Sequence, residues 1–229
     1  MAKNLGRELL LYLLLKTGLR LGIISKMLGV GRDAVQTRIA NTALVKHTPP
    51  FSKGMLIQPD GFMRFRFKSL IGYVFMCVYR NVKDRIQNKC HAMDKAALDV
   101  LSFTLTYELF QEIYRARFEA FTSTTGDSKQ ITASQLWQFV RFFETGCVGT
   151  MVYKCGLTRP VSLNGRTFCS CQPPKRSREY WIDFNREIDQ AISDIEEGAV
   201  VRGDHIDARL QQMLLEASCV ILGVAQQPA

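Results

Sequence analysis

The apolar positions of the chain recur mostly at the three- and four-residue steps of an α-helix. Three long stretches show this period, at residues 62–86, 94–121 and 132–146, and each carries apolar side chains along one face. Those side chains are Ile71, Val74, Val78 and Val82 in the first stretch, Leu98, Leu101, Leu105, Leu109 and Ile113 in the second, and Leu136, Phe139, Val140 and Phe143 in the third. The pattern predicts a mainly α protein, a helical bundle with the second stretch as its central helix.

Local signals indicate where these helices begin and end. Asp94 is placed to cap the second stretch, and Thr132 with Gln135 forms a capping box for the third. Gly146 then stops that helix. The prolines and glycines between positions 49 and 61 predict an ordered loop.

Residues 4–16 predict a first helix that is apolar on most of its circumference, because six of them between positions 9 and 15 are leucines. Such a helix is either enclosed in the core or covered by another chain. The tract Arg64-Phe65-Arg66-Phe67-Lys68 poses a similar choice, between stacking on nucleic acid and core packing. We favour the core for its two phenylalanines.

Residues 19–42 predict two short helices joined by a tight glycine turn, the arrangement of a helix-turn-helix. Gly29 can end the first helix in the left-handed conformation, Val30 fills the angle, and Gly31 is a permissive start for the second helix. Apolar side chains hold the inner sides, Leu21, Ile24 and Leu28 in the first helix and Val35 and Ile39 in the second.

The outer side of the second helix is polar and predicts contacts to double-stranded DNA. Arg32, Gln36 and Thr37, with Arg38 toward the edge, are side chains that hydrogen-bond base edges or phosphates. Outside that helix, Lys26 and Lys46 are candidates for phosphate contacts. The alternative is an ordinary helical hairpin whose polar face is only solvated.

The charge distribution favours the DNA interpretation. Residues 1–90 hold 16 Lys and Arg against 4 Asp and Glu, a net charge of +12, whereas residues 91–229 hold 14 against 17, a net charge of −3. The positive half surrounds the candidate recognition helix, as phosphate binding requires. From Glu179 onward there are 10 acidic residues against 3 basic ones, so we do not expect this part to contact DNA.

Size and composition set further bounds. A chain of 229 residues with 47% apolar residues can bury a sizeable core. Its longest apolar runs are far shorter than the roughly 18 residues of a membrane span, and no signal cleavage site follows them, so we expect a cytoplasmic protein without membrane contact. No nucleophile or acid/base constellation is visible, so we expect no enzyme.

Four of the seven cysteines, Cys147, Cys155, Cys169 and Cys171, fall within 25 positions, which suits a metal site better than a disulfide framework. Extended arms on either side of Asn164-Gly165, a strong turn signal, predict a hairpin like that of a zinc knuckle. The usual two Cys-x2-Cys pairs are incomplete, however. Cys169 and Cys171 stand one residue too close, and Val152 lies where Cys155 would have its partner. A metal-free hairpin with buried thiols is the alternative.

Three segments together resemble the FlhC family, the larger DNA-binding subunit of the bacterial flagellar master regulator. They are the loop PPFSKGMLIQPDGFM (49–63), the helix LWQFVRFFETG (136–146) and FCSCQPP (168–174), in matching order and spacing. The resemblance covers roughly residues 10–178, and the acidic tail is longer than is usual in the family.

The resemblance implies a helical activator subunit that assembles with an FlhD-like protein into a hetero-oligomer, binds promoters of flagellar genes and recruits RNA polymerase. It also implies a four-cysteine zinc site. Cys155 and Cys171 fall on the family's ligand positions, whereas Val152 and Phe168 stand where the other two cysteines would be. Cys169 could replace one of these through a small register shift, and Cys147 could reach in from the end of the preceding helix.

The resulting expectation has three parts: a helical DNA- and partner-binding domain (1–146), a cysteine hairpin (147–178) and an acidic helical tail (179–229). Two other functions stay open beside the DNA-binding activator. One is a paralogue that has lost DNA binding and keeps partner assembly, and the other is a metal or redox sensor using the cysteine cluster.

Overall fold

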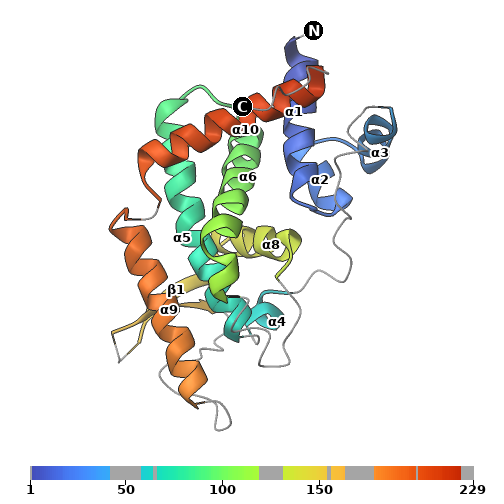
Figure 1. The fold of residues 1–229 in the computed structure, drawn as a ribbon. Helices are drawn as coiled ribbons and strands as arrows, with labels where there is room; N and C mark the ends of the chain where they lie inside the picture. Colours follow the sequence, from blue (N-terminus) through green and yellow to red (C-terminus); the bar gives the residue numbers. More distant parts are fainter. Residues whose placement is uncertain are drawn as a thin grey trace.

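The computed structural model describes residues 2–41, 58–63, 66–118, 131–153, 156–162, 178–199 and 201–222. Its helices are α1 (Ala2–Lys16), α2 (Leu21–Leu28), α3 (Arg32–Ala40), α4 (Pro59–Met63), α5 (Arg66–Lys89), α6 (Lys95–Ile113), α8 (Ala133–Glu144), α9 (Arg178–Glu196) and α10 (Gly203–Leu222), and its strands are β1 (Val148–Val152) and β2 (Thr158–Ser162). Helices dominate, with a small two-stranded antiparallel sheet (Figure 1). The predicted mainly α class is confirmed.

The helices α5 and α6 form an antiparallel pair at the centre of the bundle (Figure 1). The predicted inner face of α5 is buried, and α6 is buried on all sides between Val100 and Thr106, as expected for a helix packed against α1, α2, α5 and α10. Asp94 caps α6 as predicted, accepting a hydrogen bond from the Ala97 amide. The helix ends at Ile113, earlier than the sequence indicates, and a separate helical turn covers residues 115–118.

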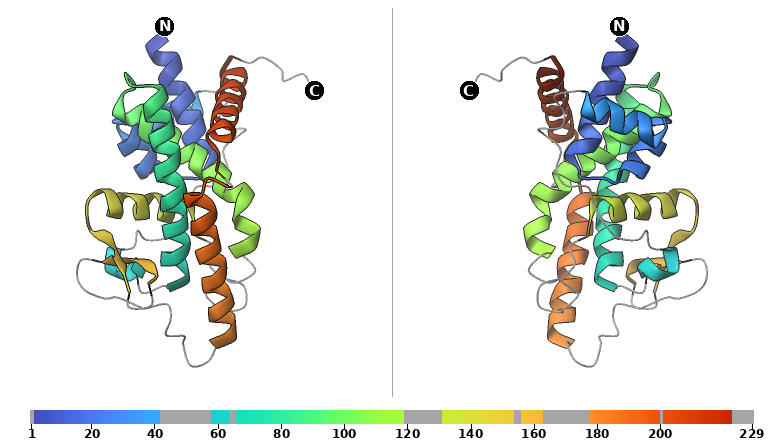
Figure 2. Two further views of the ribbon diagram at one scale, coloured as in Figure 1. Left: turned by 90° about the vertical axis from the view of Figure 1, so that its left-hand side faces the viewer. Right: turned by 90° about the vertical axis from the view of Figure 1, so that its right-hand side faces the viewer.

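The leucine-rich helix α1 is enclosed in the core of its own chain. Residues Leu11 to Leu15 are at most 5% exposed, because α2, α6 and α10 pack around them. Of the two possibilities left by the sequence, the core position is therefore the one observed. The helix that covers α1 from outside is α10, which belongs to the acidic C-terminal segment (Figure 2).

One aromatic residue near the start of α5, Phe67, packs in the core. The Phe67 ring lies against Trp181 and Phe184 of α9, with ring centroids 5.0 and 4.6 Å apart, which confirms the core assignment for this residue; Phe65 lies outside the described residues. The prediction of a loop through residues 59–61 is wrong, since Pro59 begins the short helix α4. Proline is well tolerated in a first helical turn, and Phe62 in the same helix is completely buried.

The capping box of α8 is confirmed. The Thr132 hydroxyl accepts a hydrogen bond from the Gln135 amide, and the Gln135 side chain accepts one from the Thr132 amide. Gly146 follows the helix with a φ of 73°, in the left-handed region that suits glycine.

A β-hairpin precedes the one that the sequence predicts around Asn164-Gly165. β1 and β2 pair from Val148 with Ser162 to Val152 with Thr158, so the chain reverses within residues 153–157, where Gly156 has a φ of 83°. The glycine supplies the left-handed conformation that this turn needs. Asn164-Gly165, the predicted turn, lies outside the described residues, as do the polar segment 122–128 and most of the loop 49–58.

The acidic segment packs onto the rest of the chain. α9 lies along α5, and α10 crosses α1 and α6 (Figures 1 and 2). Arg159 of β2 has a side chain only 3% exposed and pairs with Asp189 of α9 at 2.5 Å. The described helices of residues 178–222 therefore share one hydrophobic core with the N-terminal half. None of the described helices has the length and apolar character that crossing a membrane requires.

Candidate nucleic-acid interface

The short helices α2 and α3 are joined by the three residues Gly29, Val30 and Gly31. Gly29 has φ 62° and ψ 33°, and the Val30 amide donates to the Ser25 carbonyl at 3.0 Å, which closes the end of α2. Gly31 is extended, and its carbonyl accepts the Val35 amide of the first turn of α3. Both glycines thus hold the positions that the sequence predicts for them.

A narrow apolar contact attaches α3 to the molecule. Val35 is completely buried and is the only buried residue of α3, while Val30 and Ile39 are half-buried against the same core. α3 packs chiefly on α2, and α2 in turn packs on α1 and α6. The Arg20 amide, just before α2, donates to the Ser134 hydroxyl of α8 at 3.2 Å. The support of α3 is therefore firm although α3 itself stands apart (Figure 1).

The outer face of α3 carries the predicted DNA-binding side chains. Arg32, Gln36 and Thr37 are exposed, and within the described part of the chain no hydrogen bond or ion pair holds their side chains. Arg38 is half-buried at the edge and has an interaction of its own. The structure thus brings four of the six predicted residues together on one protruding helix.

The two lysines predicted to contact phosphate are placed only in part. Lys26 is exposed in the last turn of α2. Lys46 lies outside the described residues. A phosphate contact by Lys26 beside α3 is compatible with its position.

Folding changes the electrostatics inferred from the sequence. Several cations of the basic half pair with carboxylates of the second half, so they are not available to an external phosphate. Lys83 lies 2.8 and 2.7 Å from Asp99 and Glu144, and both Arg85 and Lys89 pair with Asp207 of α10. The charge asymmetry along the chain is therefore partly cancelled in space, and the unpaired cations nearest α3 carry more weight than the total of +12.

Three of the four predicted zinc ligands, Cys155, Cys169 and Cys171, lie outside the described residues. Cys147 is exposed immediately before β1, and its sulfur accepts a hydrogen bond from the Thr145 hydroxyl at 3.4 Å. Tyr153, which leads to the turn, follows the other end of β1. β1, which separates Cys147 from Tyr153, spans four residue-to-residue steps of about 3.3 Å, or roughly 13 Å. This length is far more than the separation between two ligands of one zinc ion. Cys147 is therefore badly placed to complete a site at the turn.

One basic residue near α2 and α3, Arg20, belongs to none of the motifs that the sequence shows. Arg20, at the start of α2, is half-buried, and its Nε is buried without a hydrogen-bond partner in the described part of the chain. Its only sequence signal is a positive charge at the beginning of a helix, where a cation is unfavourable.

The candidate interface is thus a protruding polar helix on a buried support. Comparisons of the chain with protein-family models, with curated protein sequences and with solved structures find no match.

Proposed function

We propose that this protein is a DNA-binding subunit of a transcriptional activator, with α3 as the helix that enters the major groove. The observation that supports this most is the state of Arg32, Gln36 and Thr37, which are exposed together on a helix fixed to the core mainly through Val35. Side chains of this kind pair with base edges, arginine with guanine and glutamine with adenine. A helix that stands out from the body also meets the groove without interference from its neighbours.

From the resemblance to FlhC, we further propose that the protein acts in the cytoplasm with an FlhD-like partner at flagellar promoters and recruits RNA polymerase. The leucine-rich helix α1 no longer argues for a partner, because it is covered by α10. The most exposed of the large apolar side chains among the described residues are Val152 in the hairpin and Leu215 and Leu222 on α10, and these offer the better contact surface.

The decisive experiment separates base reading from general attraction to DNA. Duplexes preferred by the protein are first selected from a random library, and affinity for selected and random DNA is then compared. Arg32→Ala and Gln36→Ala should each lower the preference for selected DNA by about 1–3 kcal/mol, because each removes a contact to a base.

Lys26→Ala and Lys46→Ala serve as the phosphate-contact comparison. Each substitution should weaken binding to selected and to random DNA equally and should reduce the slope of log affinity against log salt by about one unit. Arg186→Ala, which removes a cation that is 74% exposed on α9, should change neither quantity. Base recognition by α3 would be refuted if the Arg32 and Gln36 variants lost the same amount of affinity for selected DNA and for random DNA.

We propose a zinc site formed by Cys155, Cys169 and Cys171, with a fourth ligand other than Cys147. Thiolates of this kind would bind zinc, and the binding would contribute directly to the free energy of folding. Metal analysis of protein purified without chelator should then find about one zinc per chain. Cys155→Ser and Cys171→Ser should lose the metal, and the matched Cys147→Ser should retain it. A protein that contains no metal, and whose unfolding temperature does not change when a chelator is added, would favour the metal-free hairpin.

The alternative of a redox sensor gains nothing from Cys77. A sensor needs an exposed thiol with a lowered pKa. Burial instead raises the pKa of the Cys77 thiol to about 11, which makes it unreactive at neutral pH. The DNA-binding proposal is therefore the one that the described residues support best.

A further inference from the structure

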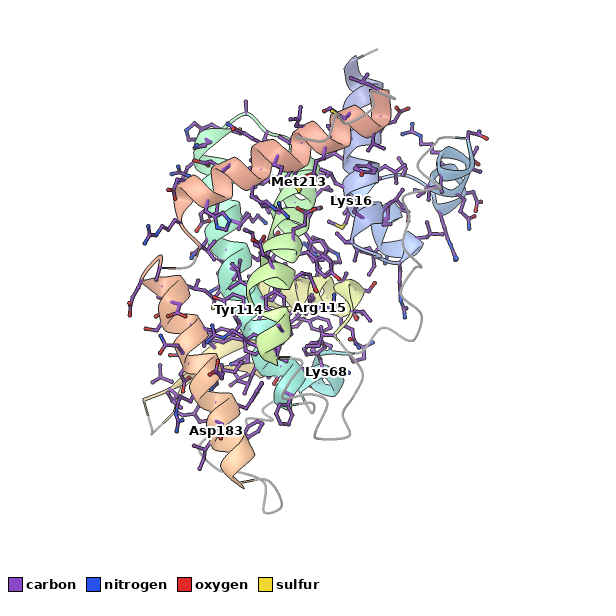
Figure 3. The ribbon with its side chains drawn as sticks, viewed as in Figure 1. Lys16, Lys68, Tyr114, Arg115, Asp183 and Met213 are labelled. Atoms are coloured by element: carbon purple, nitrogen blue, oxygen red, sulfur yellow. The ribbon has the colours of Figure 1, made fainter. Side chains whose placement is uncertain are left out.

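The two strands of the hairpin differ in how far the rest of the chain covers them. α4 and α5 pack against β2, whereas β1 is buried at Val148 and exposed from Thr150 to Val152, where the Val152 side chain is 66% exposed. The hairpin lies behind α9 in the view of Figure 3, in which Asp183 of that helix is labelled, and Figure 2 shows it at the periphery of the molecule. β1 is therefore the strand that other molecules can reach.

The pairing with β2 fixes which backbone groups of β1 point outward. The Tyr153 amide donates to the Leu157 carbonyl at 3.0 Å, so the backbone of Tyr153 faces β2. Because alternate residues of an antiparallel strand direct their amide and carbonyl to the same side, Gly149 and Met151 face β2 as well. The residues whose backbone groups point away from β2 are Val148, Thr150 and Val152. Within the described part of the chain, no hydrogen bond uses these outward groups.

β1 also lacks the features with which proteins usually protect an exposed strand edge, namely lysine, proline or a bulge. The segment from Thr145 to Tyr153 contains no charged residue and no proline, and its pairing with β2 runs through β1 without a bulge. β2 contains Pro160, and the amide that proline lacks would lie on the side away from β1. Of the two strands, β1 is thus the one that can accept a further strand.

A second copy of β1 matches this edge. If two copies lie antiparallel about a two-fold axis at Thr150, the two Thr150 residues exchange backbone hydrogen bonds, and Val148 of each copy does the same with Val152 of the other. Threonine then faces threonine and valine faces valine, which are favourable cross-strand pairs, and no like charges meet. A strand of an unrelated protein would gain the backbone hydrogen bonds without this match of side chains.

We infer that the outer edge of β1 is a contact between two copies of the chain, in which the β1 strands pair antiparallel and join two hairpins into one continuous sheet. The pairing gives the outward amides and carbonyls their partners and covers the exposed Val152. Leu215 and Leu222 of α10 then remain for a partner of another kind. The inference rests on the hairpin alone, and it holds whether or not α3 binds DNA or the cysteines bind zinc.

The test measures the association of the full-length protein without DNA by sedimentation over a wide range of concentration. The parent protein should form dimers as the concentration rises. Thr150→Lys and Thr150→Glu each place like charges opposite one another across the axis, so each should weaken dimerisation about tenfold. Mixing the two variants in equal amounts should restore association, because lysine then faces glutamate.

Thr158→Lys is the matched control, because Thr158 is exposed in the same hairpin but lies on β2, away from the axis. It should dimerise like the parent protein. Thr150→Pro is a second test, since it removes an outward amide and leaves the hydrogen bonds to β2 intact, and it should also weaken dimerisation. Circular dichroism shows whether each variant is folded. A parent protein that is monomeric at every concentration would leave the edge to a different protein and overturn the inference. The same holds if the lysine and glutamate variants associate no better together than apart.

Discussion

At the scale of single residues, a close approach between two helices depends on a glycine. A Cβ atom added at Gly72 of α5 would lie 3.0 Å from the ring of Phe139 of α8. That ring has little freedom to move, because Phe62 and Phe143 pack against it with centroids 4.8 and 5.2 Å away. The absence of a side chain at this position therefore sets how tightly α8 sits on α5.

We expect Gly72→Ala to destabilise the protein by about 1–3 kcal/mol, the cost of overpacking a tight core. This cost outweighs the gain of up to about 1 kcal/mol that alanine brings to a helix interior. Urea unfolding followed by circular dichroism measures the difference. Gly22→Ala is the control, because Gly22 on α2 faces open space, and this substitution should not lower the stability. An unchanged or higher unfolding midpoint for Gly72→Ala would show that Phe139 yields.

At the scale of elements, ion pairs orient α10 against the bundle. Asp207 of α10 accepts hydrogen bonds from Arg85, at 3.2 and 2.6 Å, and from Lys89, both on α5. Hydrogen bonds from Arg85 and then Lys89 lower the pKa of Asp207 to about 2, from an ordinary value of 3.8. A lowered pKa means that the folded state favours the ionised carboxylate.

This shift makes a prediction about acid stability. The contribution of Asp207 should be fully present above about pH 5, where the carboxylate is ionised in both states, and should be lost as the pH falls through 3.8 toward 2. Asp207→Asn should therefore be less stable than the parent protein at pH 6, with the difference shrinking between pH 4 and pH 2. Urea unfolding across this range tests it. Asp183→Asn, at an exposed site on α9, provides the control, and a difference independent of pH would contradict the assignment.

At the scale of the whole molecule, the acidic C-terminal segment completes the core of the basic N-terminal half. Ile206, Met213 and Ala217 of α10 are at most 2% exposed, and α10 covers the leucine-rich helix α1. Burying side chains such as Ile and Met contributes about 1.5–3 kcal/mol each. Their sum is a large part of the roughly 5–15 kcal/mol by which a typical protein is stable.

We expect that removing residues 201–229 leaves a chain that aggregates, because α1 then exposes its leucines to water. Size-exclusion chromatography with light scattering makes the comparison. Leu215→Ala is the matched control within the same helix, since this leucine is 66% exposed, and it should remain as soluble as the parent protein. A monomeric, stable truncated chain would show that α10 is dispensable for covering α1.

Most of the helices could be predicted from the sequence, because their signals are local. The apolar period of α5 and α6, the Asp94 cap, the capping box at Thr132 and the glycines around Val30 all act within a few residues of each other. The polar face of α3 follows from the same spacing, so Arg32, Gln36 and Thr37 were predictable as an exposed group. The early end of α6 and the short helix α4 were not, since packing of buried rings such as Tyr114 and Phe62 competes with local preference there.

Which surfaces are covered, and which charged side chains are paired, could not be predicted and depends on the folded chain. The period of α1 leaves open whether its leucines meet the same chain or another, and the answer depends on α10, some 200 residues away in sequence. Likewise, the pairing of Lys83 with Glu144 and of Arg85 with Asp207 brings together residues distant along the chain. Burial and ion pairing depend on distances in space, which a linear pattern of residues does not contain.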